Sequence, residues 1–400
     1  SVISVIRVSG PEALRIADEI FKGRIPPSRA RDRSVLFGEI AGEDGKPIDE
    51  VLLTVMRGPH SMTGEDVVEI SCHGGMVAPR LVLRRVLAAG ARLAEPGEFT
   101  RRGFLNGRID LTQAEAVCDI VRAASEKAHN LALRQLKGGL SEELKRVEDL
   151  LFEDLVWLEA EIDFPEDEIE AVDWRAMSEN LKTACRHLER LLATEEVGRF
   201  IKQGLEVAIV GRPNVGKSSL FNRLLGRERV IVSPVPGTTR DTVDGRLNLN
   251  GFCLSLHDTA GLGASADLIE AEAVRRSRAC LEECDLALVV IDVSEPLTDA
   301  DRDIIREASR KQHLIVANKI DLPVRAEDDV LHGAIQVSAL KGLGIDDLVA
   351  RLKQAASERA SDFELEIAVS ERHAQCIRQA LEAVRRAQHG LDTSISPELI

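Results

Sequence analysis

The spacing of hydrophobic and polar residues changes twice along this chain. Up to about residue 110, short apolar runs at 2–8, 51–55 and 67–71 alternate with turn signals and with helical spacing near 11–21 and 77–89. From 111 to about 200, apolar residues follow the 3.6-residue helical period, interrupted at 137–139 and at 164–165. Continuous apolar strands then alternate with helices over about 204–355, and helical spacing returns at 371–388. The pattern predicts several domains, with an α/β domain inserted into a helical one.

A glycine-rich loop follows the first apolar strand of the inserted domain. After the strand at 207–210 comes Gly-Arg-Pro-Asn-Val-Gly-Lys-Ser-Ser, and a helical pattern follows it. Such a loop turns successive backbone N–H groups toward a phosphate, while the lysine adds a positive charge and the first serine hydroxyl is placed to ligate Mg²⁺. We therefore expect nucleotide contacts from Asn214, Val215, Gly216, Lys217, Ser218 and Ser219.

Three further motifs follow in the order that a guanine-nucleotide switch requires. The strand at 254–257 leads to Asp258, which would hold the Mg²⁺ shell, and to Gly261, whose N–H would meet a γ-phosphate. The strand at 314–317 ends in Asn318, Lys319 and Asp321. A carboxylate at Asp321 accepts from the ring N–H and the exocyclic amine of guanine, which predicts a strong preference for GTP over ATP. The strand at 334–337 brings Ser338 and Ala339 to the same sheet edge, where they would support the base.

The sequence predicts a multidomain chain with three kinds of domain. An α+β domain occupies 1–110, an all-α helical domain occupies 111–203 and 356–400, and an inserted α/β P-loop GTPase domain of the Ras-like type occupies 204–355. Because both ends of the insertion lie on helices, loop ordering at the nucleotide would move those helices.

Charge, cysteine content and apolar runs limit the partners and the cell compartment that we expect for the protein. The 400 residues carry a formal net charge of −15, and residues 141–173 hold fourteen acidic side chains against two basic ones, so a broad polycationic surface is excluded. We interpret the acidic block as a solvated helix face. Seven cysteines without a paired C-x-x-C predict a reducing compartment, and no apolar run reaches the length needed to cross a bilayer. We expect a cytoplasmic protein.

Three long strings carry a resemblance to a known family. They are Thr-Gly-Glu-Asp-Val-Val-Glu-Ile-Ser-Cys-His-Gly-Gly at 63–75, Pro-Gly-Glu-Phe-Thr-Arg-Arg-Gly-Phe-Leu-Asn-Gly-Arg-Ile-Asp-Leu at 96–111, and Ile-Asp-Phe-Pro at 162–165. With the domain order, they make the chain resemble the MnmE (TrmE) family of tRNA-modification GTPases over essentially its whole length. The resemblance implies that the protein works together with the flavoprotein MnmG (GidA), and that the two add an aminomethyl-type group to C5 of the wobble uridine of certain tRNAs.

The resemblance also implies cofactors and an assembly. The one-carbon unit would come from a tetrahydrofolate derivative, in the 5-formyl or 5,10-methylene form. The protein would be a homodimer joined through its N-terminal domain, with GTPase domains that pair when K⁺ is bound. Asn214 would help to ligate K⁺ together with backbone carbonyls of the 231–237 loop, including Ile231 and Ser233. This ion would take the place of an arginine finger.

Catalytic roles follow from the same resemblance. Thr238 and Thr239 would form the first switch, with Thr239 joining Ser218 and Asp258 around Mg²⁺. Glu270 falls where the family has a glutamate that orients the attacking water, although a solvated carboxylate in a first helical turn is the alternative interpretation. Together with Glu270, we count Lys217 and Thr239 as catalytic candidates.

Folate-binding candidates lie in the N-terminal domain. A pterin ring presents adjacent donors and acceptors that a carboxylate reads as a pair, and Glu65 and Glu69 are the available carboxylates. The possible partners for the glutamate tail of folate are Arg7, Arg101 and Arg108. The structural alternative is that Glu65 turns a loop and Glu69 alternates outward on a strand.

The sequence departs from the family pattern at both of its ends and at one residue of the inserted domain. The sequence begins within a strand without methionine and ends at Ile400, before the Cys-containing tail of the family, so we expect that residues precede Ser1 and that the chain as given lacks part of the modification machinery. Gly263 stands where many members have arginine.

The alternative function is an Era-like ribosome-assembly or RNA-binding switch without chemistry of its own. Such a protein would carry a KH module for RNA, but the Gly-x-x-Gly loop of that module is not evident at 60–111.

Overall fold

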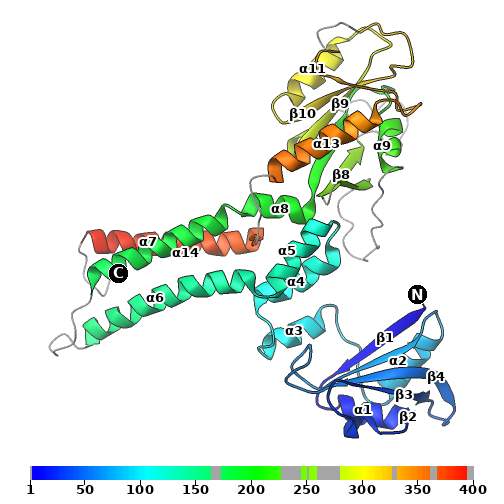
Figure 1. The fold of residues 1–400 in the computed structure, drawn as a ribbon, viewed down its shortest axis with the longest axis vertical. Coiled ribbons are helices and arrows are strands. Elements are labelled where there is room, and N and C mark those ends of the chain that lie inside the picture. The colour runs from blue at the N-terminus through cyan, green and yellow to red at the C-terminus, as the bar shows by residue number, and fades with distance from the viewer. Residues whose placement is uncertain are drawn as a thin grey trace, which may run out of the picture. The chain divides into compact units, whose positions relative to one another are not determined.

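A computed structural model gives the fold of the chain (Figure 1). It describes residues 2–163, 173–226, 245–249, 252–258, 280–326, 331–360 and 367–393. Two compact units make up the chain, 1–118 and 119–400, and each is described by itself. The α+β, helical and inserted α/β architecture confirms the predicted fold class.

An antiparallel sheet with helices on one face forms the first unit. Its strand order is β1-β5-β4-β3-β2, with strands β1 (Ile3–Ser9), β2 (Phe21–Gly23), β3 (Ser34–Ala41), β4 (Pro47–Met56) and β5 (Val67–His73). The helical elements are α1 (Ala13–Ile20), η1 (Pro27–Arg29), α2 (Ala78–Ala88) and α3 (Glu98–Leu105). Helices α1 and α2 contact the sheet, and the core between them includes the fully buried Ile20, Leu53, Ile70 and Val82.

The other face of this sheet leaves apolar side chains exposed. Phe37 lies opposite Leu52, Leu52 opposite Ser71, and Ser71 opposite Val5, so these residues form one row across four strands. The exposed fractions are 68% for Phe37, 49% for Leu52 and 56% for Val5. A row of exposed apolar residues on a flat sheet is typical of an interaction surface.

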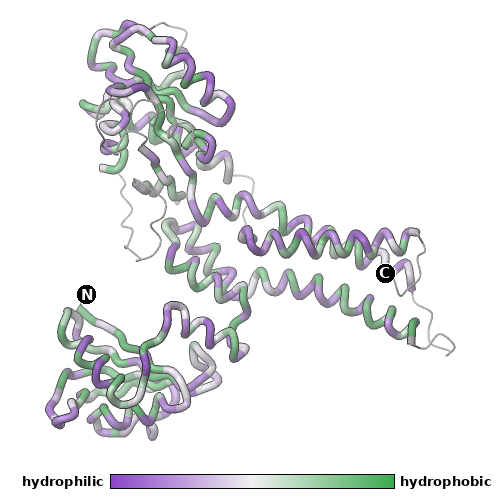
Figure 2. The backbone as a smooth tube through the Cα atoms, turned by 180° about the vertical axis from the view of Figure 1, so that it is seen from behind, coloured by the Kyte–Doolittle hydropathy of each residue, from purple (hydrophilic) through white to green (hydrophobic). Residues whose placement is uncertain are grey.

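Helices that are distant in sequence pack together in the second unit. The elements are α4 (Leu111–Arg122), which begins in the first unit, α5 (Glu126–Leu136), α6 (Gly139–Asp163), α7 (Trp174–Leu192), α8 (Glu195–Gln203) and the returning α14 (Glu371–Asp392). Helix α14 lies along α7 (Figure 1), and their buried residues join those of α6 in one core. Figure 2 shows the alternation of apolar and polar positions along these helices. Among the described residues, no helix is long and apolar enough to span a membrane.

A mixed, mostly parallel sheet forms the inserted domain. The strand order is β11-β10-β9-β6-β8-β7, and only β7 runs antiparallel to its neighbour. The strands are β6 (Leu205–Val210), β7 (Gly245–Leu249), β8 (Phe252–Asp258), β9 (Leu286–Asp292), β10 (His313–Asn318) and β11 (Ile335–Val337). The described helices are α9 (Lys217–Leu225), α11 (Asp299–Ala308) and α13 (Ile345–Ala360).

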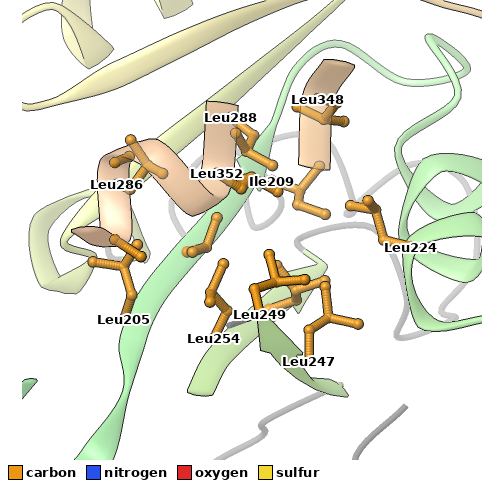
Figure 3. Packing of buried hydrophobic residues seen from close by; sticks show 14 of the residues in the cluster. Leu205, Ile209, Leu224, Leu247, Leu249, Leu254, Leu286, Leu288, Leu348 and Leu352 are labelled. Carbon is orange, nitrogen blue, oxygen red and sulfur yellow. The ribbon is translucent and has the colours of Figure 1, made fainter. Parts of the chain in front are cut away.

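The inserted domain packs its sheet between helices, and the strand order locates the edge of the sheet at which a ligand would bind. All seven residues of β9 are buried, as in a strand covered on both faces. Leucines of the strands meet those of α9 and α13 on one side of the sheet (Figure 3). Strand β6 lies between β8 and β9, and chain order reverses there, so the carboxyl edge beside β6 is where an open α/β sheet binds its ligand.

Candidate functional site

The phosphate loop begins where β6 ends. Gly211 and Gly216 have φ values of 153° and 100°, and Asn214 has a φ of 64°. A Cβ on Gly211 would overlap the carbonyl oxygen of Val290, and one on Gly216 would overlap the side-chain amide of Asn318. Both glycines are therefore required by conformation and by space, and they allow the loop to turn against the neighbouring strands.

Lys217 is fixed over this loop. It is 7% exposed, and its Nζ donates to the carbonyl oxygens of Gly211 and Arg212, each at 2.8 Å. Ser218 and Ser219 follow it and are exposed on the first turn of α9. The positive end of a helix, with its first-turn N–H groups and a nearby ammonium group, is typical of an anion site.

Asn318 joins three of the predicted motifs. Its side chain is 2% exposed, its Nδ2 donates to the carbonyl oxygen of Val215 at 2.8 Å, and its Oδ1 accepts from the N–H of Ala339 at 3.0 Å. The sequence predicted a nucleotide contact for Asn318. That contact stays a prediction, and in the structure the Asn318 side chain holds the phosphate loop and the 338–340 loop at a fixed separation.

Asp321 is held as a carboxylate next to this frame. The hydroxyl of Ser338, a fully buried residue, donates to Asp321 Oδ1 at 2.6 Å, and this bond lowers the pKa of Asp321. Lys319, with a φ of 71°, donates from Nζ to Asp292 Oδ2. Burial alone would raise the pKa of Asp292, but the bonds from Lys319 and Ser294 outweigh it and the pKa lies below its usual range. The Asp321 carboxylate, the predicted contact of the base, therefore stays ionised at neutral pH.

Three residues that support this site, Arg223, Arg212 and Asp292, were not predicted from the sequence. Arg223 of α9 donates to the carbonyl oxygens of Ala339 at 3.0 Å and Leu340 at 2.5 Å. Arg212 donates to the buried Asp301 at 2.8 Å, a bond that raises the pKa of Arg212, and Asp292 anchors Lys319. Arg212 and Arg223 contact residues 89 or more positions away, so no local motif reports them.

Several predicted residues lie outside the described residues. These are Thr238, Thr239, Gly261, Gly263, Glu270, Ile231 and Ser233. Of Asp258 only the backbone is described, at the end of β8 opposite Ile209 of β6. That register puts it at the sheet edge from which the phosphate loop starts.

A second polar cluster, the N-terminal cluster, consists of Arg7, Glu65, Glu69, Glu98 and Arg102. Arg7 of β1 and Glu69 of β5 are opposite each other, and Arg7 Nε donates to Glu69 Oε1 at 2.7 Å. The same guanidinium lies 5.4 Å from the ring centre of Phe99, within the range of a cation–π contact. The cluster thus joins two strands and α3.

Glu65 and Glu98 share one arginine. Arg102 Nη1 donates to Glu65 Oε2 and Arg102 Nη2 donates to Glu98 Oε1, each at 2.9 Å, and the hydroxyl of Ser9 donates to Glu65. Glu98 is 4% exposed and also accepts from Arg92 and from the N–H of Glu95. Bonds from Arg92 first, then from the Glu95 N–H and from Arg102, lower the pKa of Glu98 to about 2.

The other two folate candidates are placed differently. Arg108 Nε donates to the carbonyl oxygen of Ser61 at 3.2 Å, in the loop that leads to Glu65. Arg101 is exposed and contacts Glu95 at 3.4 Å. The structure thus pairs Arg7 with Glu69 and Glu65 with Arg102, sets Arg108 beside the loop that leads to Glu65, and places Arg101 against another acid, Glu95. Among the described residues, no group of three His, Cys, Asp or Glu side chains suits a metal ion.

Comparison with known proteins covers the whole chain. The family model for the TrmE N-terminus matches residues 1–108, and the model for the MnmE helical domain matches residues 111–400. The chain is 44% identical to the tRNA modification GTPase MnmE of Symbiobacterium thermophilum over 100% of this chain and 89% of that protein. It is 46% identical to the protein of the same name from Moorella thermoacetica over 88% of this chain and 78% of that one.

A solved structure is similar in sequence to part of the chain. A variant of Aquifex aeolicus Era bound to GDP.AlF4⁻ is 34% identical over 38% of this chain and 56% of that one, with a TM-score of 0.30.

Proposed function

Because the chain belongs to the MnmE family of tRNA modification GTPases, we propose that its GTP hydrolysis drives modification of the wobble uridine at C5 with a tetrahydrofolate one-carbon unit. The observation that carries the GTPase part is the Asn318 frame, which ties the phosphate loop to the loop beside Asp321. Relatives that match the full length of the chain favour this function over the Era-like alternative.

The described residues fit GTP in three places. Backbone N–H groups at the start of α9 and the Lys217 ammonium would bind the β-phosphate. The Asp321 carboxylate, held by Ser338, would accept from the guanine ring N–H and amine. The exposed Ser218 hydroxyl fits Mg²⁺, a cation that prefers oxygen ligands, and Asp258 and Thr239 would complete the protein's share of that shell.

Potassium would supply positive charge at the transferring phosphate. Asn214 is exposed with a left-handed backbone at the turn of the phosphate loop, which leaves its amide oxygen free to point at the nucleotide. Carbonyl oxygens of Ile231 and Ser233 would join it, and Glu270 would orient the attacking water. These three residues enter the proposal from sequence alone.

The N-terminal cluster would receive the folate. Two carboxylates and two arginines beside an aromatic ring match the donors and acceptors of a pterin and the acidic tail of folate. Arg108 and Arg101 would extend the site toward that tail. Since Glu65 and Glu69 already accept from arginines, a ligand would have to exchange partners with them.

The assembly would be a homodimer joined through the exposed sheet face of the first unit. A second copy fits this face because three of the four residues in the row, Phe37, Leu52 and Val5, are exposed and apolar and would pack against the same row of the partner. We further propose the flavoprotein MnmG as a partner, tRNA as the substrate and the cytoplasm as the site of action, following the family.

The experiment is a comparison of GTP turnover in KCl and in NaCl. We expect much faster turnover in KCl, since the ion replaces an arginine finger worth about 10³–10⁵ in rate. The difference should shrink in Asn214→Ala, while exposed Asn222→Ala on the same domain keeps it. Equal turnover of the unaltered chain in the two salts would contradict the potassium role but leave GTP hydrolysis standing.

A further inference from the structure

One exposed segment of the first unit has a charge opposite to that of the chain as a whole. Residues 22–33 carry Lys22, Arg24, Arg29, Arg31 and Arg33 against a single acid, Asp32, in a chain of net charge −15. All five cationic residues are exposed. Within the described part of the chain, the side chains of Lys22, Arg24, Arg29 and Arg31 make no ion pair with any residue.

The backbone of the segment is anchored, although four of its five cationic side chains make no ion pair among the described residues. The Ser28 N–H donates to Asp18 at 2.9 Å, and Arg57 donates through its guanidinium to the carbonyl oxygen of Ser28 at 2.7 Å. The N–H of Arg57 donates to Asp32 at 2.7 Å, while Pro27 and Ala30 are buried in the domain. The backbone that carries the arginines is therefore fixed, so that a ligand need order only their side chains.

A chain of hydrogen bonds leads from this segment to the N-terminal cluster. Arg33 donates from its N–H to the carbonyl oxygen of Val55 and from its guanidinium to that of His60. The next loop is closed by a bond from the Gly58 N–H to Asp66, and by one from the Ser61 hydroxyl to the carbonyl oxygen of Glu65. The cationic segment thus borders the loop that carries the folate candidate Glu65.

We propose that segment 22–33 binds the phosphodiester backbone of the substrate tRNA and so brings the target uridine toward the N-terminal cluster. The inference rests on the proposed function, which makes tRNA the substrate. Arginine forks match phosphate oxygens in two-point contacts, and free cations release phosphate counterions on binding. RNA fits better than a membrane surface, because Ile25, 44% exposed, is the segment's one exposed large apolar side chain.

The test is binding of fluorescently labelled, unfractionated tRNA to the full chain at several salt concentrations. The variant is Arg29→Gln with Arg31→Gln. Its matched control is Arg80→Gln with Arg84→Gln, which removes the same charge from exposed arginines of α2 in the same unit. We expect affinity at about 0.1 M salt to fall about ten- to hundredfold in the first variant, with the slope of log K against log salt reduced by about two. The control should retain its affinity and slope.

Other outcomes separate the inference from the function on which it rests. If the unaltered chain binds tRNA and 5-formyltetrahydrofolate but both double variants lose tRNA equally, or neither does, the surface is wrong and the function stands. If the unaltered chain binds neither ligand, both are wrong. A first variant that keeps tRNA binding but loses binding to phosphatidylglycerol vesicles would overturn the RNA assignment in favour of a membrane. Retained GTP hydrolysis and folate binding show that the variants are folded.

Discussion

The nucleotide site and the N-terminal cluster hold their functional side chains in opposite ways. At the nucleotide site, a neutral and buried amide, Asn318, connects backbone groups of two loops, and Asp321 is fixed by one hydroxyl. In the N-terminal cluster, ion pairs hold the side chains: Arg7 pairs with Glu69, and Arg102 pairs with both Glu65 and Glu98. At the nucleotide site, a residue that is not itself charged holds the backbone of the loops that carry the predicted binding residues. In the N-terminal cluster, the predicted binding residues are held by direct ion pairs with arginines.

This difference predicts different sensitivities. Hydrogen bonds between a buried amide and the backbone depend little on salt or pH, so the nucleotide site should fail mainly when its frame is cut. Partly exposed ion pairs are screened by salt and change with protonation. The N-terminal cluster should therefore respond to charge and pH, and a ligand there competes with existing partners.

The largest expected effect is a change of base preference in Asp321→Asn. The amide replaces an acceptor-only group with one that also donates, so guanine loses charge-assisted bonds and xanthine gains a partner. The ratio of GTP to XTP affinity should fall by about 10⁴, a typical size for a site built around such bonds. Competition binding with the two nucleotides measures it. The exposed Asp299→Asn of the same domain should leave the ratio unchanged, and an unchanged ratio in Asp321→Asn would refute the base assignment.

A smaller effect is expected when the frame itself is cut by Asn318→Ala. The substitution leaves the carbonyl of Val215 and the N–H of Ala339 buried without this partner, at a cost of about 2–4 kcal/mol to the inserted domain. GTP affinity should fall as the two loops separate. Denaturant unfolding and nucleotide titration check both effects, with Asn222→Ala expected within about 0.5 kcal/mol of the parent. A stable Asn318→Ala protein with normal GTP affinity would show that the frame is dispensable.

The smallest expected effect is a change of pH dependence in Glu98→Gln. The pKa of Glu98 in the folded state is about 2, below its usual 4.5, so its stabilising contribution is present above about 4.5 and is lost as pH falls toward about 2. The protection factors of the α3 amides, which correct their exchange rates for the intrinsic pH dependence of exchange, should fall as pH drops across that window in the parent and change less in the variant. Exposed Glu95→Gln is the control. Equal pH dependence in the parent and in Glu98→Gln would mean that the pair network does not stabilise α3.

The sequence predicted much of the inserted domain, because its chemistry is written in consecutive residues at strand ends. Changes in the spacing of apolar residues also located strands β1, β4 and β5 and the break between α5 and α6. Strands β2 and β3 were missed. The first has only three residues, and glycines interrupt both, at Gly23 and Gly38, where any larger side chain would overlap the ring of Phe21.

The sequence could not predict which side chains pair with one another inside the N-terminal cluster. Glu65 and its arginine partner Arg102 are 37 residues apart, and Arg7 and Glu69 are 62 apart. Nothing local indicates which acid meets which base, since only the folded sheet and α3 bring them together. For the same reason Glu98 was not named, although it is the most buried carboxylate of its cluster.

We propose that one chain carries two separate ligand sites, one for GTP and one for folate. Calorimetric titration of the full chain with a non-hydrolysable GTP analogue and with 5-formyltetrahydrofolate tests it most directly, using the parent, Asp321→Asn and Glu65→Ala. We predict that the parent binds both ligands, that Asp321→Asn loses only the nucleotide, and that Glu65→Ala weakens only the folate. A parent that does not bind folate, or a Glu65→Ala variant that binds it normally while losing the nucleotide, would contradict the account.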